Sequence, residues 1–406
     1  MLRRVGAEPI IILSHTAQFG GGEVALTRLL AALDRGRFAP RAVLFTDGPL
    51  RERLAELDVP SVVLPLGRLA SVTRDEAGSA AGLTARAAGG AAFVARLARL
   101  LRTEAPALAV ANTLKSATLL AAAAPLARTP WAWHLHDRLA DDYLPRRTAA
   151  VMRAIARRAP RQLVANSSAT LRALGPIDPA RVSIAFPGLG PEAFRDPVST
   201  RRTTQTAPVV GILGRISATK GQLEFARAAE TVLARFPHAR FRIIGAALFA
   251  DGPYEQRLRH ELAARQLEGA VELAGWSSDP ASALRELDLV VHASPVPEPF
   301  GQVVVEAMAA GVPVVATDAG GIPEILDPEG VATSLADGVR ESPLGLLVRP
   351  GDADALARAV AAALESPDRR REAAERARAS AAQRFTSERT ARAVEAAWTR
   401  ALHPRR

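Results

Sequence analysis

The chain has 406 residues, of which 48 % are hydrophobic and 23 % charged, and it contains no cysteine. This length favours two globular domains, and the lack of cysteine excludes a disulfide scaffold, a thiolate nucleophile and a cysteine-ligated metal. The net charge is +10, carried almost wholly by arginine because lysine occurs only at Lys115 and Lys220. Nucleic acid, an anionic membrane surface and phosphorylated substrates therefore stay open as partners.

The N-terminal residues carry two arginines followed by an apolar run of only four residues. A signal peptide needs roughly 7–15 apolar residues in a row, and a membrane span needs about 20. We therefore expect neither feature, and a cytoplasmic location is predicted.

Short β-branched and apolar runs alternate along the first half with alanine-, leucine- and arginine-rich stretches of helical spacing. Such runs are typical of strands buried on both faces, and the helices between them imply parallel, right-handed crossovers. A helix around Phe93–Leu101 has leucines at helical spacing beside several arginines, which favours a core-facing helix and leaves a basic membrane-contacting face open. The predicted strands are Ile10–Leu13, Arg41–Phe45, Ser61–Leu64, Leu108–Ala111, Trp131–His136, Gln162–Ala165 and Val182–Phe186.

The second half repeats this alternation. The predicted fold class is therefore α/β, with two doubly wound, Rossmann-like domains. The predicted strands of the second half are Val209–Leu213, Arg240–Ile244, Val271–Leu273, Leu289–His292, Pro313–Ala316 and Leu346–Val348.

A polar stretch around Arg195–Ala207 has few apolar residues and is typical of a linker. The last helical stretch, which includes Trp398, is predicted to cross back onto the first domain. Ligands of such sheets bind at the carboxyl ends of the strands, so candidate site residues are expected directly after the strands. The predicted organisation is a first domain over residues 1–195, a linker over 196–207, a second domain over 208–385 and a C-terminal helix over 386–406.

Three glycines at 20–22 follow the first strand and lead into a helix. A glycine turn at a helix N-terminus lets backbone amides approach an anion or a sugar. Gly20, Gly22 and Ala25 also meet the spacing of a dinucleotide fingerprint, with Asp47 available for the ribose. Hydride transfer with a dinucleotide, binding of an anion or sugar, and a plain strand-to-helix turn therefore all stay open for this loop.

Two histidines, His134 and His136, lie on one side of the fifth predicted strand, and Asp137 follows directly. A His–Asp pair at the carboxyl end of a strand favours a functional role over that of a core histidine. Asp141 and Asp142 come next, but no further oxygen or imidazole ligands stand at a metal-binding spacing. No metal site is predicted.

Arg215 and Lys220 follow the first strand of the second half, and Lys220 is one of only two lysines. Thr219 and Gln222 fit a capping box, which predicts that the next helix begins near Lys220. An arginine, a lysine and the positive end of a helix together suit a diphosphate. Solvated surface charge is the alternative interpretation.

Two glutamates, Glu298 and Glu306, surround the start of another predicted helix. Two prolines stiffen the loop that carries Glu298, and the helix is expected to begin near Phe300 or Gly301 and to end at Gly311 as a left-handed cap. Both carboxylates accept hydrogen bonds from hydroxyls, and the helix N-terminus between them favours phosphate. The predicted ligand is a nucleotide sugar. A pair of glycoside hydrolase carboxylates is the alternative, and it leaves the arginine and lysine unexplained.

These motifs resemble those of the retaining glycosyltransferases of family 4, which have the GT-B fold. The two glutamates, seven residues apart, stand within EPFGQVVVEAMAAGVPVVATDAGGIPEI, and GRISATKG, RIIG, AGW and GLLVRPGD are also similar to family motifs. In the first half the glycine loop, HLHD, LVANSSA and FPGLGPEAF look like family features. One departure is the stretch Asp327–Leu344, where the family usually has a short turn.

The resemblance implies two Rossmann-like domains that face each other across a cleft. It also implies that Arg215 and Lys220 hold the donor diphosphate and that Glu306 binds the nucleotide ribose. Gly21 and Gly22 would shape the region between the acceptor and the diphosphate, which replaces the dinucleotide interpretation of this loop.

The catalytic residues that the resemblance implies are His136, beside the donor sugar, and Glu298, which would act by positioning and by stabilising charge. No covalent nucleophile is then required, because the leaving phosphate would help to deprotonate the acceptor. The transferred sugar would be held by Glu298 together with the backbone of Phe300, Gly301 and Gln302.

By the same resemblance the reaction moves a sugar from a nucleotide-diphosphate sugar to an acceptor, with no metal and no cofactor. The acceptor, which could be a glycan, a lipid-linked molecule or a small molecule, stays open, as does peripheral contact with an anionic membrane at its inner face. Another GT-B reaction such as 2-epimerisation is the enzyme alternative, and an arginine-rich binder of nucleic acid or membrane surfaces is the other. Aromatic residues make up only 4 %, so a stacking platform for nucleic acid is not expected.

Overall fold

The computed structural model describes residues 6–66, 80–195, 207–247, 251–277 and 279–403, and all but the last residue of the predicted linker over 196–207 lies outside these ranges. The chain divides into two compact units, Met1–Gly188 with Ser387–Arg406 and Leu189–Thr386. We call them the N-terminal unit and the C-terminal unit. The first boundary lies at residue 188, before the position 195 expected from the sequence.

The N-terminal unit is built on a parallel sheet with the strand order β3-β2-β1-β4-β5-β6-β7. Its strands match the seven predicted ones. They could be predicted because apolar runs such as Ile10–Leu13 are buried on both faces of the sheet. The strand order reverses between β1 and β4, which makes this the switch point of the sheet. The strands are β1 (Glu8–Ser14), β2 (Phe38–Leu44), β3 (Ser61–Val63), β4 (Leu108–Ala111), β5 (Trp131–Leu135), β6 (Gln162–Ala165) and β7 (Val182–Ile184).

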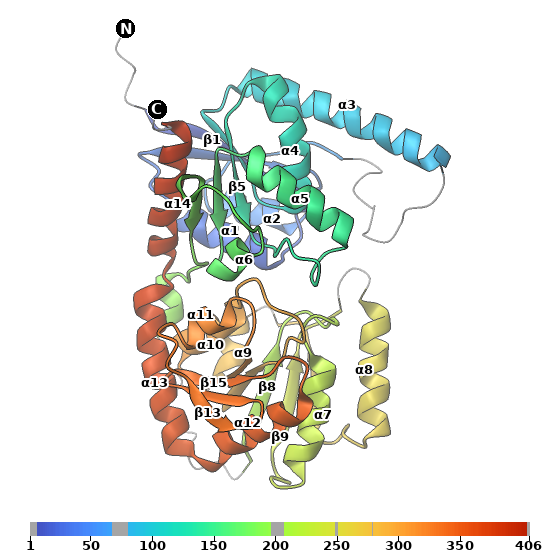
Figure 1. The fold of residues 1–406 in the computed structure, drawn as a ribbon, viewed down its shortest axis with the longest axis vertical. Coiled ribbons are helices and arrows are strands. Elements are labelled where there is room, and N and C mark those ends of the chain that lie inside the picture. Colours follow the sequence, from blue (N-terminus) through green and yellow to red (C-terminus); the bar gives the residue numbers. More distant parts are fainter. Residues whose placement is uncertain (1–5, 67–79, 196–206, 248–250, 278, 404–406) are drawn as a thin grey trace. The chain divides into compact units, whose positions relative to one another are not determined.

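Helices cover both faces of this sheet (Figure 1). The stretch expected to face the core forms part of α3, where Phe93, Leu97 and Leu101 are completely buried. The helices are α1 (Gly21–Ala32), α2 (Pro49–Glu56), α3 (Ala80–Glu104), α4 (Leu114–Ala127), α5 (Arg146–Arg158), α6 (Ser168–Arg172) and α14 (Ser387–Leu402).

The C-terminal unit is built on a sheet with the strand order β10-β9-β8-β11-β12-β15-β14-β13. The strands from β10 to β15 in this order pair in parallel, and the strand order reverses between β8 and β11. The strands are β8 (Val209–Leu213), β9 (Arg240–Ile244), β10 (Val271–Gly275), β11 (Leu289–His292), β12 (Val314–Thr317), β13 (Thr333–Ala336), β14 (Val339–Ser342) and β15 (Gly345–Val348).

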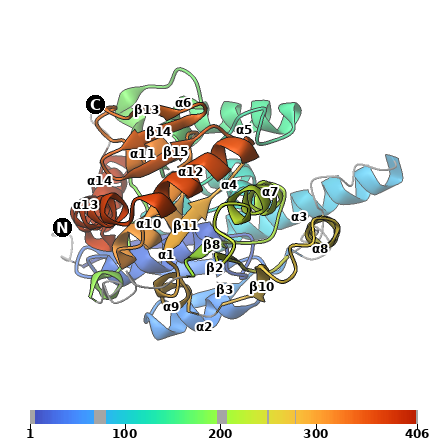
Figure 2. The same ribbon diagram turned by 90° about the horizontal axis from the view of Figure 1, so that it is seen from below.

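Two groups of helices pack in this unit: α7 against α12, and α10 against α13 (Figure 2). The helices are α7 (Gln222–Leu233), α8 (Gly252–Ala264), α9 (Pro280–Arg285), α10 (Gln302–Ala310), α11 (Ile322–Leu326), α12 (Ala353–Glu365) and α13 (Pro367–Arg384). The described residues also form two short 3-10 helices, at Pro179–Arg181 and Pro191–Phe194.

The stretch Asp327–Leu344, which departs from the usual short turn, forms a hairpin of β13 and β14 that pairs antiparallel with β15 and lengthens the sheet. Asp327 anchors its base, because Oδ1 accepts hydrogen bonds from the backbone N–H groups of Val331 and Ala332 at 2.8 and 3.1 Å. Arg340 adds an ion pair at 3.1 Å to Oδ2 of the same carboxylate. The insertion is thus an ordered part of the sheet.

The chain passes between the two units twice, and backbone contacts join the two connecting segments. Leu189 forms a parallel bridge with Thr386, and its N–H donates to the Phe385 carbonyl oxygen at 2.9 Å. After the second passage, α14 packs on α1 in the N-terminal unit. Trp398 is completely buried there, edge-on to Phe38.

Candidate functional site

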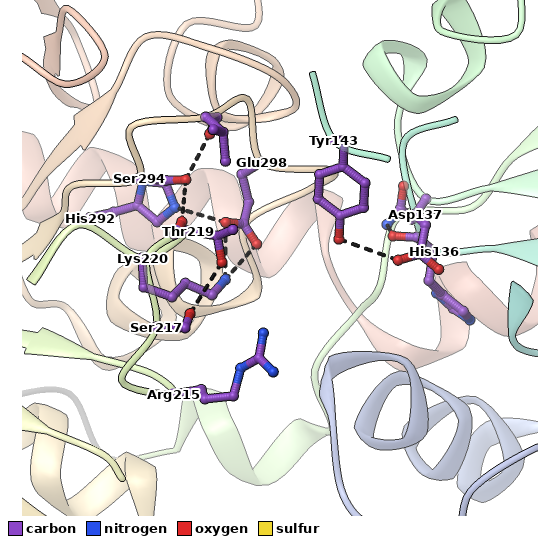
Figure 3. A network of polar contacts seen from close by, with 12 residues as sticks. His136, Asp137, Tyr143, Arg215, Ser217, Thr219, Lys220, His292, Ser294 and Glu298 are labelled. Carbon is purple, nitrogen blue, oxygen red and sulfur yellow. Dashed lines mark hydrogen bonds and ion pairs between the residues drawn. The ribbon is translucent and has the colours of Figure 1, made fainter. Parts of the chain in front are cut away.

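The C-terminal unit gathers a lysine, a glutamate and a histidine at the carboxyl ends of β8 and β11, where its strand order reverses. Lys220 Nζ lies 2.7 Å from Oε1 and 3.0 Å from Oε2 of Glu298, and His292 Nε2 lies 3.5 Å from Glu298 Oε2 (Figure 3). The exposed fraction of the side chain is 4 % for His292 and 16 % for Glu298. We call these three residues the Lys–Glu–His cluster.

The carboxyl group of Glu298 is ionised at neutral pH although it is buried. Burial opposes its ionisation, but the ammonium group of Lys220 and the contact with His292 outweigh this and hold the pKa of Glu298 well below its usual range. A carboxylate in this state only accepts hydrogen bonds. It is therefore suited to bind the hydroxyl groups of a ligand.

A hydrogen bond and a close backbone approach join the loops that follow β8 and β11. These contacts hold the residues of the Lys–Glu–His cluster together. The Ser294 hydroxyl group donates to the Thr219 carbonyl oxygen at 2.7 Å. Gly221 approaches so closely that a Cβ atom there would lie 1.9 Å from the Ala293 carbonyl oxygen. Its φ is +77°, a left-handed conformation that glycine adopts without strain. Any other residue at 221 would push the two loops apart.

The predicted capping box of Thr219 and Gln222 is wrong. α7 begins at Gln222, and its N-cap is Gly221, which has no side chain to cap with. Thr219 Oγ1 instead lies 3.1 Å from Ser217 Oγ, and the Gln222 amide donates to the Arg215 carbonyl oxygen at 3.0 Å. The close approach of the β11 loop requires glycine at the cap position, so the polar side chains around it hold the loop rather than the helix end.

Arg215, the second predicted diphosphate ligand, lies in the same loop and forms an ion pair with Asp251. Its Nη1 lies 3.2 Å from Asp251 Oδ2, at the N-cap of α8, and its side chain is 38 % exposed. The two cations predicted to share one ligand thus each lie beside a carboxylate: Arg215 beside Asp251, and Lys220 beside Glu298.

The two glutamates of the sequence motif occupy different parts of the structure, as predicted. Glu298 lies on the loop before α10, and Glu306 lies in the second turn of that helix. The backbone of Glu298 is fixed by a bridge to Gly320 and by a hydrogen bond of 2.9 Å from the Gly321 N–H to its carbonyl oxygen. This fixes the carboxylate independently of the helix.

The residues between the glutamates form the start of α10. Gly301 is its N-cap and Gln302 its first residue, so the helix begins where the sequence predicts. Phe300 is 2 % exposed, and its ring packs edge-on against Phe385. The helix ends at Gly311, which has φ of +74° and is the expected left-handed cap.

A second cluster of polar side chains lies in the N-terminal unit, at the switch point between β1 and β4. His136 Nε2 lies 3.0 Å from Asn112 Oδ1, and the Asn112 amide donates to the Gly22 carbonyl oxygen at 3.4 Å. The Asn166 amide donates to the His136 carbonyl oxygen at 3.1 Å. A Cβ atom at Gly22 would lie 3.3 Å from the His136 ring, so the glycine turn and this imidazole are in contact. The structure therefore brings the predicted residues Gly22 and His136 together.

The imidazole of His136 is neutral at physiological pH, because burial lowers its pKa to about 4. Asn112 uses its amide N–H₂ on Gly22 and offers its oxygen to the ring, so His136 Nε2 carries the proton. Nδ1 is then the ring atom that can accept a hydrogen bond. Asp137, the next residue, accepts a hydrogen bond of 3.2 Å from the Tyr143 hydroxyl group (Figure 3).

His134 has a different role, because its ring lies beside the indole of Trp398 in α14 and nearly in the same plane. The indole Nε1–H donates to His134 Nε2 at 3.1 Å, and the ring planes are 11° apart. Burial, together with the neighbouring His136, lowers the pKa of His134 to about 3. This histidine holds the C-terminal helix in place.

Acidification is expected to destabilise the N-terminal unit through His134. Its pKa is near 6.5 in an unfolded chain and about 3 when folded. The unfolded chain therefore binds a proton below pH 6.5 that the folded chain does not, and the lost free energy of unfolding reaches about 2 kcal/mol at pH 5. His134→Gln keeps an acceptor for the indole and should make this slope less steep by the contribution of His134, in urea unfolding between pH 7 and 5. His238→Gln, at an exposed position, is the control that should not.

Among the residues of these clusters that were not predicted from the sequence are His292, Asp251 and Asn112. His292 and Asn112 lie at the carboxyl ends of predicted strands, so the rule that pointed to His136 could have found them. Asp251 lies far from Arg215 in the sequence, and its pairing depends on how β8 and β9 are ordered.

Within the described part of the chain, no group of three or more His, Asp or Glu side chains is arranged to hold a metal ion. No described helix is both long and apolar enough to cross a membrane.

Both halves of the chain match known sequence families. The model of glycosyl transferases group 1 matches residues 199–380, and that of the glycosyl transferase 4-like domain matches residues 20–188. With two α/β units and these matches, the chain belongs to the family 4 glycosyltransferases of the GT-B fold.

Among solved structures, a crystal structure of Anabaena Alr3699/HepE in complex with UDP and glucose is similar, with 27 % identity and a TM-score of 0.79, covering 97 % of this chain and 99 % of that one. Among curated relatives, D-inositol 3-phosphate glycosyltransferase 2 of Catenulispora acidiphila is 32 % identical over 55 % of this chain and 52 % of its own length. The GDP-mannose-dependent alpha-mannosyltransferase of Mycobacterium tuberculosis is 32 % identical over 50 % and 46 %. The matches thus span about half the length of these curated relatives.

Proposed function

We propose that the protein is a retaining glycosyltransferase that moves a sugar from a nucleotide-diphosphate sugar to a hydroxyl group of an acceptor. One observation carries this proposal: the Lys–Glu–His cluster lies at the switch point of the C-terminal sheet, where α/β sheets bind ligands. A lysine suits a diphosphate, and an ionised glutamate suits sugar hydroxyls. The neighbouring α10 offers the positive end of its dipole to a phosphate group.

In this proposal the bond between the anomeric carbon and the donor diphosphate breaks, and negative charge grows on the leaving phosphate. Lys220 and Arg215 would neutralise that charge, so that no metal ion is needed for it. Because each cation lies beside a carboxylate, at 2.7 Å for Lys220 and 3.2 Å for Arg215, donor binding would give each a second anionic partner. Glu298 would hold the sugar hydroxyls and stabilise positive charge at the anomeric carbon.

The acceptor hydroxyl would attack on the side of the leaving phosphate, which takes up the hydroxyl proton, and the new bond keeps the anomeric configuration. His136 would contact the donor sugar as a neutral imidazole, with Nδ1 able to accept a hydrogen bond from a hydroxyl. Gly21 and Gly22 would bring their backbone close to the diphosphate, and the backbone from Phe300 to Gln302 would line the sugar.

The donor is proposed to be a UDP-hexose, supported by the UDP and glucose in the related Anabaena structure. The test is a thermal-shift panel of UDP-, GDP- and ADP-sugars, followed by measurement of nucleotide release from the best one. A raised melting temperature and release of the diphosphate support the proposal. An altered nucleotide sugar formed without an acceptor would instead indicate an epimerase, and no shift with any member of the panel would contradict nucleotide-sugar binding.

Glu306→Ala is expected to weaken the binding of UDP roughly ten- to a hundredfold, because a hydrogen bond to a charged group is worth about 1.5–3 kcal/mol. The loss should be the same for UDP and UDP-glucose, since Glu306 is proposed to bind the ribose they share. Titration calorimetry measures both affinities. Glu272→Ala, with a side chain that is 58 % exposed, is the control. Unchanged affinity in Glu306→Ala would remove the ribose role.

We also propose that the protein works in the cytoplasm and touches the inner membrane face peripherally, where a lipid-linked or envelope glycan acceptor would be found. The support is α5, whose exposed residues include Arg146, Arg147, Arg158 and Val151. Arginines beside an apolar side chain suit an anionic lipid surface. Sedimentation with anionic vesicles, but not neutral ones, is expected for the protein. Arg146→Glu with Arg147→Glu should abolish it, and equal sedimentation of both proteins would contradict this contact.

A further inference from the structure

Glu23 is a buried carboxyl group that the proposed reaction does not use. It lies in the first turn of α1 and is only 6 % exposed. The Ser14 hydroxyl group, at the end of β1, donates to Glu23 Oε1 at 3.3 Å. The backbone N–H groups of Gly20 and of Glu23 itself also donate to this carboxyl group. The side chain thus folds back over the glycine turn that precedes it.

The Glu23 carboxyl group takes the place of the side-chain N-cap that α1 lacks. Gly20 is the N-cap of α1 and has no side chain to accept the free N–H groups. A glutamate three residues after the cap reaches back to the cap N–H, which is one half of a capping box. Glu23 therefore supplies the hydrogen bonds that hold the turn, in the absence of a polar cap residue.

The turn held by Glu23 is the one that contacts the catalytic imidazole. Gly22 lies between Gly20 and Glu23, and its carbonyl oxygen accepts from the Asn112 amide at 3.4 Å. Asn112 in turn lies 3.0 Å from the ring nitrogen of His136. A change in the turn would shift Gly22 and, through Asn112, the ring of His136.

Glu23 exchanges its proton near neutral pH. Burial raises its pKa to about 7, and the Asp137 carboxylate after β5 acts in the same direction. The hydrogen bonds from Ser14 and the backbone favour the ionised form and only partly offset burial.

The other charged groups around α1 do not change the balance between burial and hydrogen bonding that sets the pKa of Glu23. His136 and His15 are neutral, each with a pKa lowered to about 4 by burial, and Lys115 on α4 acts on His15. α14 places Glu395 at the opposite end of α1, where it accepts from the Asp34 N–H at 2.9 Å. α2 carries the exposed Arg51, which pairs with Asp47 at 3.2 Å.

We propose that Glu23 is a proton-linked positioning residue, whose ionised carboxylate fixes the glycine turn, and with it Gly22 and His136, for the reaction. This rests on the proposed function. When Glu23 is ionised, its carboxylate accepts hydrogen bonds from Ser14 and from the backbone of the turn. When it is protonated, one oxygen becomes a donor, and the turn loses an acceptor. Activity therefore rises with pH through neutrality, because the charged form holds the turn.

The same proton has the opposite effect on stability. The pKa of Glu23 is raised on folding, from 4.5 to about 7. A raised pKa means that the folded chain keeps a proton which the unfolded chain has lost, so stability falls as the pH rises from 4.5 to 7. Glu23→Gln carries no charge to bury, and it should be more stable than the wild type above pH 7 although it is less active. A merely structural role would lower both.

The experiment compares the wild type with Glu23→Gln from pH 6 to 8, using release of UDP from UDP-glucose. The wild-type kcat should rise with a midpoint near pH 7, whereas Glu23→Gln should be flat and about tenfold slower at pH 8. Ser14→Ala removes a donor to the carboxylate and should move the midpoint to higher pH. Glu52→Gln, the exposed first-turn glutamate of α2, should behave as the wild type. A midpoint that persists in Glu23→Gln would overturn the proposal.

Thermal unfolding of the same proteins needs no activity and separates the two proposals. The melting temperature of Glu23→Gln relative to the wild type should rise from pH 5 to 8, and Glu52→Gln should show no such trend. If no nucleotide sugar of the panel is bound or turned over but this trend appears, the proposed function fails and the proton linkage of Glu23 stands. Parallel melting curves at all pH values would overturn the linkage, whatever the activity.

Discussion

Replacing Lys220 with alanine is expected to lower kcat/KM for a nucleotide-sugar donor by two to three orders of magnitude, roughly what the loss of one stabilising group at a developing charge costs. The variant loses the cation proposed to neutralise the leaving diphosphate. It also changes Glu298, because the ammonium group that holds this carboxylate ionised, at 2.7 Å, is gone. We expect a loss of turnover and a loss of stability, and the two can be measured separately.

The stability of Lys220→Ala should fall by about 3 kcal/mol, because an uncompensated buried carboxylate is left behind. The double variant Lys220→Ala with Glu298→Gln removes that charge, so it should regain most of the stability but no turnover. Urea unfolding and donor release measure the two effects. Arg227→Ala is the matched control, since it breaks an exposed ion pair with Glu261 on the neighbouring helix. Wild-type turnover in Lys220→Ala would contradict the proposed role.

Replacing Trp398 with alanine is expected to lower the free energy of unfolding of the N-terminal unit by about 3–5 kcal/mol, the usual cost of deleting a buried tryptophan. Trp398 is completely buried, packs edge-on to Phe38 and donates its indole N–H to His134. For a unit of this size the melting temperature should fall by roughly 6–20 °C. Differential scanning calorimetry is the measurement, since the two units can give separate transitions.

Two further variants sharpen this prediction. Trp398→Phe keeps much of the packing but leaves His134 Nε2 without its indole donor at 3.1 Å, so its loss should be intermediate. Trp276→Ala removes a tryptophan that is 60 % exposed and should change the melting temperature by no more than about 2 °C. Equal losses from Trp276 and Trp398 would contradict the packing described for α14.

Most of the strands could be predicted because a strand buried on both faces is apolar along its whole length. Leu108–Ala111 and Leu289–His292 are predicted with the bounds that the structure gives them. The cap at Gly311 could be predicted for a similar reason, since a glycine that is followed two residues later by a proline ends a helix by its own backbone preference. These features depend on neighbouring residues alone.

The partners within the site could not be predicted in this way. Lys220 and Glu298 are 78 positions apart, and they meet because β8 and β11 are neighbours in the sheet. The capping box failed for a related reason: Gly221 is needed for contact with Ala293, which belongs to a distant loop. The stretch Asp327–Leu344 stands out in the sequence as an insertion, but the strands of its hairpin are short and carry no clear apolar pattern.

The helix α14 follows the bridge between Leu189 and Thr386 and packs in the N-terminal unit, and this determines the order in which the two units can be completed. During synthesis the whole C-terminal unit leaves the ribosome before α14, so it can fold while the N-terminal unit still lacks its last helix. Until then the surface of α1 that packs against α14 and the indole-binding ring of His134 stay uncovered. The N-terminal unit begins first but is completed last, and a nascent chain stalled before residue 387 should bind chaperones through it.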